Sequence, residues 1–482
     1  MRIRWVIQVL VLILCGILIN CLRTTTSHAT SKTYVIGTDV TYPPFEFANQ
    51  KNRYVGIDID LMKAIAKQEG FKVKIKPLAF NAAIQALESG QIDGLIAGLT
   101  ITPARRVKFD FSTPYYKTGT IMAVAKNSKV HSLKQLRGKR VAIKTGTAGA
   151  TYANSIKHKY GFKTVTFDDS DNMYQDVVTG NSAACFEDQP VMQYSIQQGM
   201  KLKIVTQPTE NGNYGFAVKR GQNQALLKAF NRGFSTLQHN GQFATIQQRY
   251  LGHSQRKRSG QAQKKARGFT ALLKQNQHAL WHGFQTTMLL TIFGIVCATL
   301  FGLIIGLLGV LPNKVTQASS NIVIYFFRGL PLLVLALFIY TGIPSLTGHK
   351  ISAFVAGILT LTLDEGAYVA AFVRGGIEAV DPGQMEAARS LGVTYGRSLL
   401  KVILPQGVRL MVPSFINQFI MTLKDTSILS VIGLLELTQT GKVIIARNLE
   451  GFKIWTIIAM IYIAMITLLT WLSNFVQKRL KV

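Results

Sequence analysis

The stretch that decides the fold of the first half of the chain reads YVIGTDV (34–40), IDIDLMKAIAKQEG (57–70), VKIKPLA (73–79), NAAIQALESG (81–90) and DGLIAG (93–98). Short runs rich in β-branched residues alternate here with segments whose apolar residues recur at helical spacing. This alternation is typical of βαβ units, and it predicts a mainly parallel sheet covered by helices.

The same alternation returns further along, in TIMAVAKN (120–127), RVAIKTG (140–146) and SAACFED (182–188). Two α/β lobes are the simplest interpretation, and ligands of such lobes bind at the carboxyl ends of the strands, facing the cleft. We expect the chain to cross between the lobes near Pro114–Lys117 and near Asn213–Phe216, where closure by a hinge motion is possible.

The second half of the chain has the composition of a membrane domain. The sequence has 482 residues, enough for several domains, and long apolar segments follow Trp281. Five segments are apolar and long enough to cross ~30 Å of hydrocarbon: Thr286–Val310, Gly329–Gly348, Ile351–Val373, Leu410–Leu435 and Ile454–Val476. If the first half is exported, the basic loop from Arg374 to Arg409 and the C-terminus lie in the cytoplasm, as the positive-inside rule expects of that loop.

The N-terminus resembles a secretory signal. Arg2 and Arg4 precede an apolar run from Trp5 to Ile19, and small residues at Ser27-His28-Ala29 follow. The expected organisation is a signal peptide over 1–29, an exported domain over 30–252, a basic linker over 253–280 and a transmembrane domain over 281–482. An uncleaved anchor helix is the alternative for the first segment, and contact with an anionic surface is the alternative to a solvated linker.

The formal net charge of +31 raises the possibility of nucleic acid binding. The basic residues flank apolar segments, however, so membrane topology explains them better and no nucleic acid partner is expected. Of the four cysteines, only Cys185 lies in the exported domain, which excludes an internal disulfide there. Zinc-ligand spacing is absent, and no metal site is expected.

The sharpest motif is Glu386-Ala387-Ala388, followed by Gly392 and by Ile403-Leu404-Pro405. Small alanines let a short helix lie close in a partner's groove, and Gly392 can adopt the left-handed turn that ends it. An amphipathic loop helix without a partner is the alternative. The motif resembles the EAA loop of ABC importer permeases, and nearby segments such as GAYVAAFVRGGIEAV (366–380) resemble permeases of the polar amino acid uptake family.

One pair of residues departs from the permease pattern. Asp364 and Glu365 lie in the third predicted span, where the family would have Asn and a small or polar residue. Carboxylates inside a membrane are costly and usually face a cavity or a partner. They either line the translocation path or form a structural pair with a neighbouring span.

The exported half resembles the family of extracellular receptors for polar amino acids. The segments that carry this resemblance are DVTYPPFEF (39–47), VGIDIDLMKAIA (55–66), QIDGLIAGLTITPARRVKFDFSTPYY (91–116), VAIKTGTAG (141–149) and FEDQP (186–190). The predicted fold is therefore a two-lobed α/β domain of the periplasmic-binding-protein type (type II), followed by an all-α transmembrane domain of five spans of the type I ABC importer permease class.

A free amino acid presents a carboxylate and an ammonium, so its receptor needs a bidentate cation and an acceptor. The resemblance implies that Arg105 clamps the carboxylate, aided by Thr100 and by backbone donors near Thr147 and Ala148. The alternative for Arg105 is a solvated arginine at a helix start.

Further contacts follow from the same resemblance. Asp188 would accept from the ammonium, or it caps the helix before Pro190. Gly98 would let the backbone approach the ammonium closely. Tyr42 and Phe80 would sandwich the aliphatic stem, unless they are plain core residues.

Side-chain selectivity is implied by two charged positions. Asp39 and Lys144 fall where glutamine receptors contact the side-chain amide, although the two residues can also pair with each other in an empty cleft. Glu187 stands where the family would have histidine, which puts selectivity in doubt.

These resemblances predict the capture and translocation subunit of an ATP-driven polar amino acid importer in the plasma membrane, with its receptor domain outside. Glutamine is the expected substrate, and asparagine and glutamate are the alternatives. The sequence lacks Gly-x-x-x-x-Gly-Lys-Ser/Thr, so the chain has no catalytic residues or cofactor of its own and needs a separate ATPase that binds ATP. Five spans are too few for a whole pore, so we expect a homodimer. A ligand-gated ion channel is the remaining alternative. In such channels the pore interrupts the two lobes, whereas here both lobes run continuously to Gly252.

Overall fold

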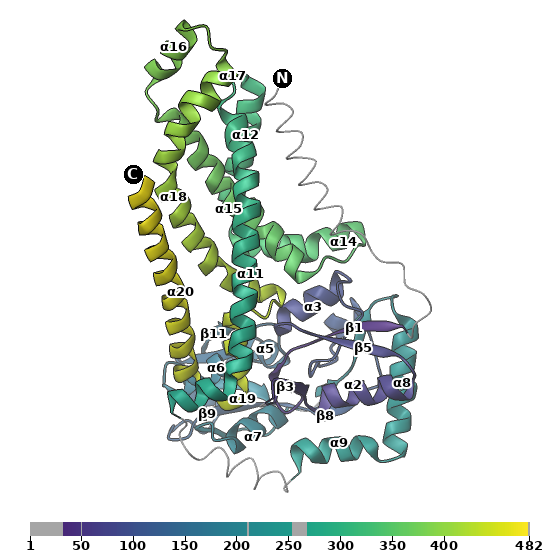
Figure 1. The fold of residues 1–482 in the computed structure, drawn as a ribbon. Coiled ribbons are helices and arrows are strands. Elements are labelled where there is room, and N and C mark those ends of the chain that lie inside the picture. Colours follow the sequence, from purple (N-terminus) through teal and green to yellow (C-terminus); the bar gives the residue numbers. More distant parts are fainter. Residues whose placement is uncertain (1–31, 50, 210–211, 253–267, 481–482) are drawn as a thin grey trace.

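The computed structural model describes residues 32–49, 51–209, 212–252 and 268–480. An α/β domain lies at one end of an elongated helical domain, and helix α16 lies at the other end (Figure 1). The predicted signal peptide (1–29) falls outside the described residues, so it stays a prediction.

The first lobe is built on a five-stranded sheet. In spatial order its strands are β5 (Lys72–Pro77), β1 (Thr33–Thr38), β6 (Gly94–Leu95), β15 (Ala217–Lys219) and β7 (Phe109–Phe111). A small sheet beside it contains β2 (Thr41–Tyr42), β3 (Glu46–Ala48) and β4 (Tyr54–Val55). The helices of this lobe are α2 (Ile57–Gln68), α3 (Phe80–Glu88), α4 (Pro103–Arg106), α8 (Gln224–His239) and α9 (Gln242–Leu251).

The second lobe repeats the arrangement. Its strands, in spatial order, are β11 (Lys163–Phe167), β10 (Arg140–Lys144), β12 (Ala184–Asp188), β9 (Thr120–Ala125) and β13 (Leu202–Ile204). Its helices are the 3₁₀ turn η1 (Leu133–Leu136), α5 (Ala148–Tyr160), α6 (Ser170–Val178) and α7 (Gln189–Gln197).

The predicted βαβ units are present in both lobes, and each sheet has a parallel core. Strand β1 is parallel to β5 and β6, and β10 is parallel to β11 and β12. Strands β15 and β9 are antiparallel to this core because each enters directly from the crossing between the lobes. Both sheets are therefore mixed, with the parallel part supplied by the βαβ units.

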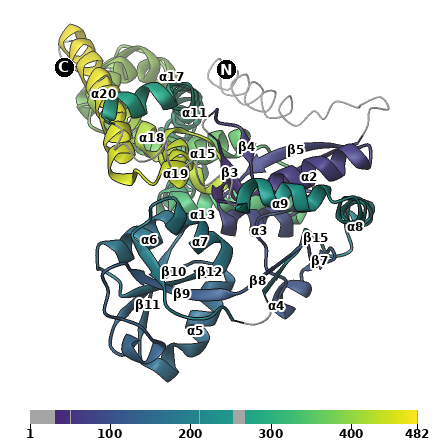
Figure 2. The ribbon, with the colours of Figure 1, turned by 90° about the horizontal axis from the view of Figure 1, so that it is seen from below.

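The lobes are joined by a two-stranded ribbon at the segments predicted for the crossing. Strand β8 (Tyr116–Thr118) pairs with β14 (Gly212–Tyr214), and Asn213 lies opposite Lys117. Figure 2 shows the two lobes side by side with β8 between them. A narrow double crossing of this kind permits rotation of one lobe against the other.

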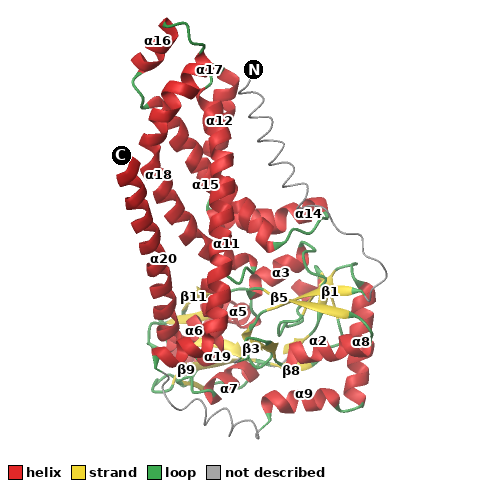
Figure 3. Ribbon diagram, in the orientation of Figure 1, coloured by secondary structure: helices red, strands yellow, loops and turns green. Residues whose placement is uncertain are grey.

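The helical domain contains one very long helix and several shorter ones. Its elements are α11 (Phe269–Val310), α12 (Lys314–Gly329), α13 (Leu332–Leu337), the π-helical η2 (Phe338–Gly342), α14 (Ile343–Thr347), α15 (Ala353–Glu378), α16 (Pro382–Ser390), α17 (Tyr395–Ser398), the π-helical η3 (Leu399–Ile403), α18 (Leu404–Asp425), the 3₁₀ helix η4 (Thr426–Ile432), α19 (Leu437–Asn448) and α20 (Gly451–Leu480). Figure 3 shows the contrast between this helical part and the mixed α/β part.

Four helices in the described part of the chain are long and apolar enough to cross a membrane, or five if one bent pair counts as a single span. The bent pair is α12 with Leu332–Thr347, and it turns by 98° at the start of the predicted second span, Gly329–Gly348. Pro331 explains the break, because it has no N–H to donate and it holds Leu330 in an extended conformation.

Helix α11 begins at Phe269, inside the segment predicted to be a linker. Leu272 and Leu280 belong to an apolar cluster with Leu437 and Ile444 of α19. Packing against α19 therefore extends the helix well beyond the part that the apolar composition marks as a span.

Close packing of α11 on α15 depends on small residues. Gly294, Gly302 and Gly306 recur at helical spacing on one face of α11, and a Cβ atom on Gly302 would lie 2.5 Å from the Cβ atom of Val369. Helices in lipid gain stability from such close approach, since lipid offers no hydrophobic driving force between them.

We predict that Gly302→Val destabilises the helical domain by about 1–3 kcal/mol because the added methyl groups overlap Val369. Thermal unfolding of the purified chain measures this, and the midpoint should fall. Gly375→Ala is the matched control, since nothing lies within 4 Å of an added Cβ there. Equal midpoints for both variants would show that the close contact is not needed.

Candidate functional site

A small cavity lies between the two lobes. Every predicted ligand contact except Asp39 lines it: Tyr42, Phe80, Gly98, Thr100 and Arg105 from the first lobe, and Lys144, Thr147, Ala148 and Asp188 from the second, together with Ala97. Most of these residues follow the carboxyl ends of strands or begin helices, as the α/β topology requires.

Asp39 lies just behind this cavity and pairs with Lys144 across the cleft. The Lys144 Nζ to Asp39 Oδ2 distance is 2.7 Å, and the two side chains are 2% and 3% exposed. Burial lowers the pKa of Lys144, but the carboxylates of Asp39, Glu187 and Asp169 together more than offset this effect, and the net pKa is raised. The two residues therefore pair with each other in the structure.

The guanidinium of Arg105 points into the cleft. Thr102 caps the short helix α4 by accepting from the Arg105 backbone N–H, which fixes the start of the helix. Nη1 of Arg105 donates to the Thr100 carbonyl oxygen at 2.6 Å, and Nη2 donates across the cleft to the Gly146 carbonyl oxygen at 2.8 Å. The Arg105 side chain also lies over the ring of Phe80, at 5.6 Å.

Asp188 is aimed at the cleft and not at its own helix. Its side chain makes no capping hydrogen bond with α7, and it accepts from the hydroxyls of Tyr42 and Tyr214. Burial, reinforced by the neighbouring Glu187 carboxylate, raises the pKa of Asp188 to about 6. A cationic partner would therefore stabilise the ionised form of the Asp188 carboxylate.

Glu187 is buried and its two oxygens accept four hydrogen bonds. Tyr42 OH and the Asp188 backbone N–H donate to Oε1 at 2.9 Å each. Ser170 Oγ and Tyr174 OH donate to Oε2 at 3.0 and 2.8 Å. Glu187 thus organises the second lobe beneath Asp188 and does not line the cavity.

Thr147 begins helix α5, whose first residue is Ala148. The Thr147 side chain accepts from the Ala150 backbone N–H at 3.1 Å. The first N–H groups of a helix are unpaired within it, so this end of α5 presents donors to the cavity.

Gly98 has a backbone φ of 51°, and a Cβ atom there would lie 2.8 Å from the ring of Tyr42. Glycine is needed at this position because the ring and the backbone lie so close. The Gly98 backbone N–H donates to Asp58 Oδ2 at 2.8 Å, so the residue that supports the glycine is Asp58.

Asp58 and its neighbour Glu46 were missed by sequence reasoning. Both are fully buried behind the cavity, and Tyr115 OH also donates to Asp58 at 2.8 Å. Burial raises the pKa of Asp58 to about 6 and raises that of Glu46 well above its ordinary value. The available signal was an aspartate on the apolar face of the predicted helix over 57–70.

The residues of the EAA-like loop lie far from the cavity, at the opposite end of the molecule (Figure 1). Glu386 and Ala387 are exposed on α16, and Ala388 is buried against its surroundings. Gly392 has a φ of 79°, the left-handed turn expected at the end of this helix. Leu391 beside it is 84% exposed.

The intramembrane carboxylates face the bundle interior. Glu365 accepts a hydrogen bond from the Gln418 side chain on α18, and both Asp364 and Glu365 are buried. This contact ties α15 to α18, as the structural pair with a neighbouring span predicts. Among the residues that the structure describes, no group of His, Cys, Asp or Glu is gathered as a metal site requires.

Two family models match the chain. Residues 34–253 match the bacterial extracellular solute-binding proteins, family 3, and residues 298–482 match the binding-protein-dependent transport system inner membrane component. The glutamine transport system permease protein GlnP of Escherichia coli K12 is 31% identical over 204 residues, which are 42% of this chain and 93% of that protein.

The α/β domain has relatives whose sequence identity to this chain is comparable to that of the permease relative. The arginine-binding extracellular protein ArtP of Bacillus subtilis is 29% identical over 226 residues, 47% of this chain and 88% of that protein. The solved substrate-binding domain 2 of Lactococcus lactis GlnP is 38% identical, with a TM-score of 0.37, and the match covers 47% of this chain and 98% of that domain.

A two-lobed solute-binding domain followed by a helical membrane domain defines a component of an amino acid transporter. The chain belongs to the binding-protein-dependent ABC transporters and joins a family 3 solute-binding domain to a permease domain in one polypeptide. These two parts are called the receptor domain and the permease domain below.

We predict that Glu187→Ala destabilises the receptor domain by about 1–3 kcal/mol for each buried donor left without an acceptor. Glu187→Gln is the matched control, because its carbonyl can accept from the Asp188 N–H while the hydroxyls of Ser170 and Tyr174 rotate to accept from its NH₂. Thermal unfolding monitored by circular dichroism should show a large fall for alanine and a small one for glutamine. A large fall for both would mean that the charge matters more than the hydrogen bonds.

Proposed function

We propose that this chain captures a polar amino acid, most specifically glutamine, outside the cell and carries it through the plasma membrane as the permease of an ATP-driven importer. The observation that carries the proposal is the convergence of Arg105, Asp188 and the Asp39–Lys144 pair around one cavity between the lobes. A cation, an anion and an amide-compatible pair are what a free amino acid with a neutral polar side chain requires.

The backbone groups of the ligand are assigned to two residues. Its carboxylate replaces Gly146 as the partner of the Arg105 guanidinium, with Thr100 and the N-terminal end of α5 nearby. Its ammonium lies beside Asp188, whose carboxylate already faces the cavity. Tyr42 and Phe80 enclose the aliphatic stem.

The side chain of the ligand is assigned to the Asp39–Lys144 pair. The carbonyl oxygen of a side-chain amide can accept from Lys144, and its NH₂ group can donate to Asp39. An amide can therefore lie between the two residues, form a hydrogen bond with each and add no net charge. A glutamate side chain would bring a second carboxylate toward buried Asp39, and a cationic side chain would approach Lys144. Either arrangement leaves a charge poorly compensated in a dry site. Asparagine is shorter and reaches the pair less well.

The permease domain is proposed to work as a homodimer with a separate ABC ATPase. Four or five spans in one chain are few for a complete pore. The exposed helix α16, with Glu386 and Ala387 on its surface, supports docking of the ATPase on the face opposite the receptor domain. An ion channel is disfavoured because both lobes precede α11 without interruption.

Calorimetry on the purified full-length chain tests the proposal, with glutamine, asparagine, glutamate and arginine as the panel. We expect glutamine to bind most tightly. Arg105→Ala should weaken every ligand by at least about a hundredfold, because two charge-assisted hydrogen bonds are lost. Lys144→Ala should change which ligand binds best.

The neighbouring exposed Arg106 supplies the control, since Arg106→Ala leaves the cavity untouched. No binding of any polar amino acid would overturn the receptor assignment. Equal losses for all ligands in both the Arg105 and the Lys144 variants would overturn the division between backbone and side-chain recognition.

The raised pKa of Asp188 predicts a pH dependence. The ligand ammonium needs the ionised carboxylate, so below a pKa of about 6 binding must first release a proton. Affinity should be constant above pH 7 and should fall about tenfold at pH 5. In the ligand-free chain the sign is opposite, because a raised pKa contributes stability at low pH that is lost as the pH rises through about 6. Calorimetry in buffers of different ionisation enthalpy counts the released proton, and an affinity that does not change between pH 5 and 7 would contradict the assignment.

A further inference from the structure

The first lobe is fastened to the permease domain by buried and polar contacts. Lys350 Nζ lies 2.7 Å from Asp93 Oδ1, and the Gln91 side chain donates to the Tyr340 carbonyl oxygen and accepts from the Ile351 N–H. One apolar cluster combines first-lobe residues and permease residues: Leu78, Phe80, Ala83 and Leu95 with Leu335, Tyr340, Leu429 and Ile432. Phe80 of the ligand cavity is thus continuous with the permease core.

Helix α19 of the permease domain is held to the same lobe. Arg447 donates to the Asn49 carbonyl oxygen, to Asn52 Oδ1 and to Asn276 Oδ1 on α11. Val443 packs against Val40 and Ala48 of the first lobe. The first lobe, α11 and α19 therefore form one connected body.

The second lobe meets the permease domain along another face of α19. Lys442, Ile445, Ala446 and Leu449 follow the spacing i, i+3, i+4, i+7, so they lie on one side of the helix. Lys442 and Ile445 line a small cavity with Asp169, Asp171 and Asn172 at the start of α6, where Thr41 and Trp455 complete the lining. Figures 1 and 2 place α19 beside α6 and α7.

The end of α19 is where the first lobe, the second lobe and the permease domain meet. A small cavity there is lined by Pro43 and Phe47 of the first lobe, by Tyr194, Ser195 and Gln198 of the second lobe, and by Ala446, Arg447 and Leu449. Leu449 also packs against the apolar core of the second lobe that contains Met173 and Met192.

Leu449 adopts a conformation that a leucine ordinarily avoids. Its φ is 57°, in the left-handed region, where the Cβ atom crowds the backbone. Such strain persists where surrounding contacts impose it. Leu449 is the C-terminal cap of α19, and its backbone N–H donates to the Ile445 carbonyl oxygen. The second lobe packs against its side chain in the closed arrangement marked by the Asp39–Lys144 pair and by the bond from Arg105 to Gly146.

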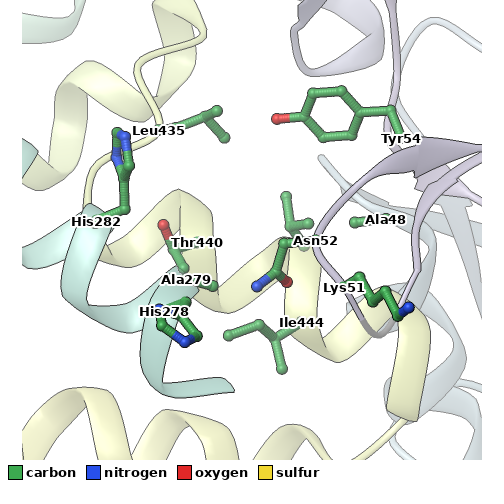
Figure 4. A pocket seen from close by; sticks show the side chains of 12 residues that line it. Ala48, Lys51, Asn52, Tyr54, His278, Ala279, His282, Leu435, Thr440 and Ile444 are labelled. Atoms are coloured by element: carbon green, nitrogen blue, oxygen red, sulfur yellow. The ribbon is translucent and has the colours of Figure 1, made fainter. Parts of the chain in front are cut away.

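On its third side α19 borders a pocket between the β3–β4 loop and α11. Lys51, Asn52 and Tyr54 lie on one wall of this pocket, and His278 and His282 lie on the other. Figure 4 shows Thr440 and Ile444 of α19 facing this pocket.

We infer that the Lys442–Leu449 face of α19 is the docking surface on the permease domain for the second lobe in its closed position. The first lobe stays fixed, the second lobe moves, and Leu449 links ligand binding to the geometry of the permease domain. This inference rests on the proposed amino acid binding. Ligand binding and docking of the second lobe on α19 are thermodynamically linked, and this linkage is reciprocal. Docking contacts that exist only in the closed state therefore also raise the affinity for the ligand.

The test is Leu449→Asn in the full-length chain, since asparagine tolerates the left-handed conformation but lacks the apolar contact. We expect glutamine affinity to fall about fivefold to tenfold, the loss of one partly buried leucine contact. Leu346→Asn is the control, because Leu346 is 81% exposed on α14 and its variant should keep the parent affinity.

Distances between pairs of spin labels report the position of each lobe separately in the same variants, after the native cysteines have been replaced. A pair at Asn181 and Phe452 reports the second lobe against the permease domain, and a pair at Lys67 and Phe452 reports the first lobe. Leu449→Asn should broaden the Asn181–Phe452 distances, with or without glutamine, and leave the Lys67–Phe452 distances unchanged.

The outcomes distinguish this inference from the proposed function. If glutamine binds but Leu449→Asn changes neither the affinity nor the Asn181–Phe452 distances, the docking surface is wrong and the receptor assignment stands. If no amino acid binds, the receptor assignment fails, and the ligand-free distances still decide whether Leu449 holds the second lobe.

Discussion

An ammonium and a carboxylate that meet in the dry interior, Lys144 and Asp39, hold the two lobes of the receptor domain together. Neither charge is stable alone where almost no water reaches it, so each requires the other as long as the cleft is closed. Across the same cleft, the Tyr42 hydroxyl donates to Glu187 and Asp188, and Arg105 donates to the Gly146 carbonyl oxygen. The charged groups of the site thus already pair with one another, and a ligand gains only the difference between its contacts and those that it replaces.

This constraint explains why the surroundings of the cavity are so polar. Asp188 and Glu187 are adjacent and buried, and they accept hydrogen bonds from the hydroxyls of Tyr42, Tyr174 and Tyr214. Because these tyrosines come from both lobes, rotation of one lobe changes the hydrogen bonds of both carboxylates. Closure, protonation and binding of an ammonium group are therefore linked through one network.

Much of the site could be predicted because its residues follow strand ends and helix starts whose positions the sequence pattern determines. Arg105, Thr147 and Asp188 are examples of this kind. The partners of Glu187 and the buried pair of Glu46 with Asp58 could not be predicted, since they depend on contacts between segments far apart in the chain. The roles assigned to the ligand contacts remain proposals that the geometry supports.

The membrane half shows the same division. Composition marks the apolar helices, but it does not reveal the 98° bend at Pro331 or the extension of α11 to Phe269, which follow from a missing N–H and from packing on α19. One chain is expected to supply both receptor and permease. Uptake of radiolabelled glutamine by proteoliposomes that contain only this chain and an ABC ATPase measures whether it does. We expect ATP-dependent accumulation without any separate binding protein, and a requirement for an added soluble receptor would show that the receptor domain does not serve its own permease.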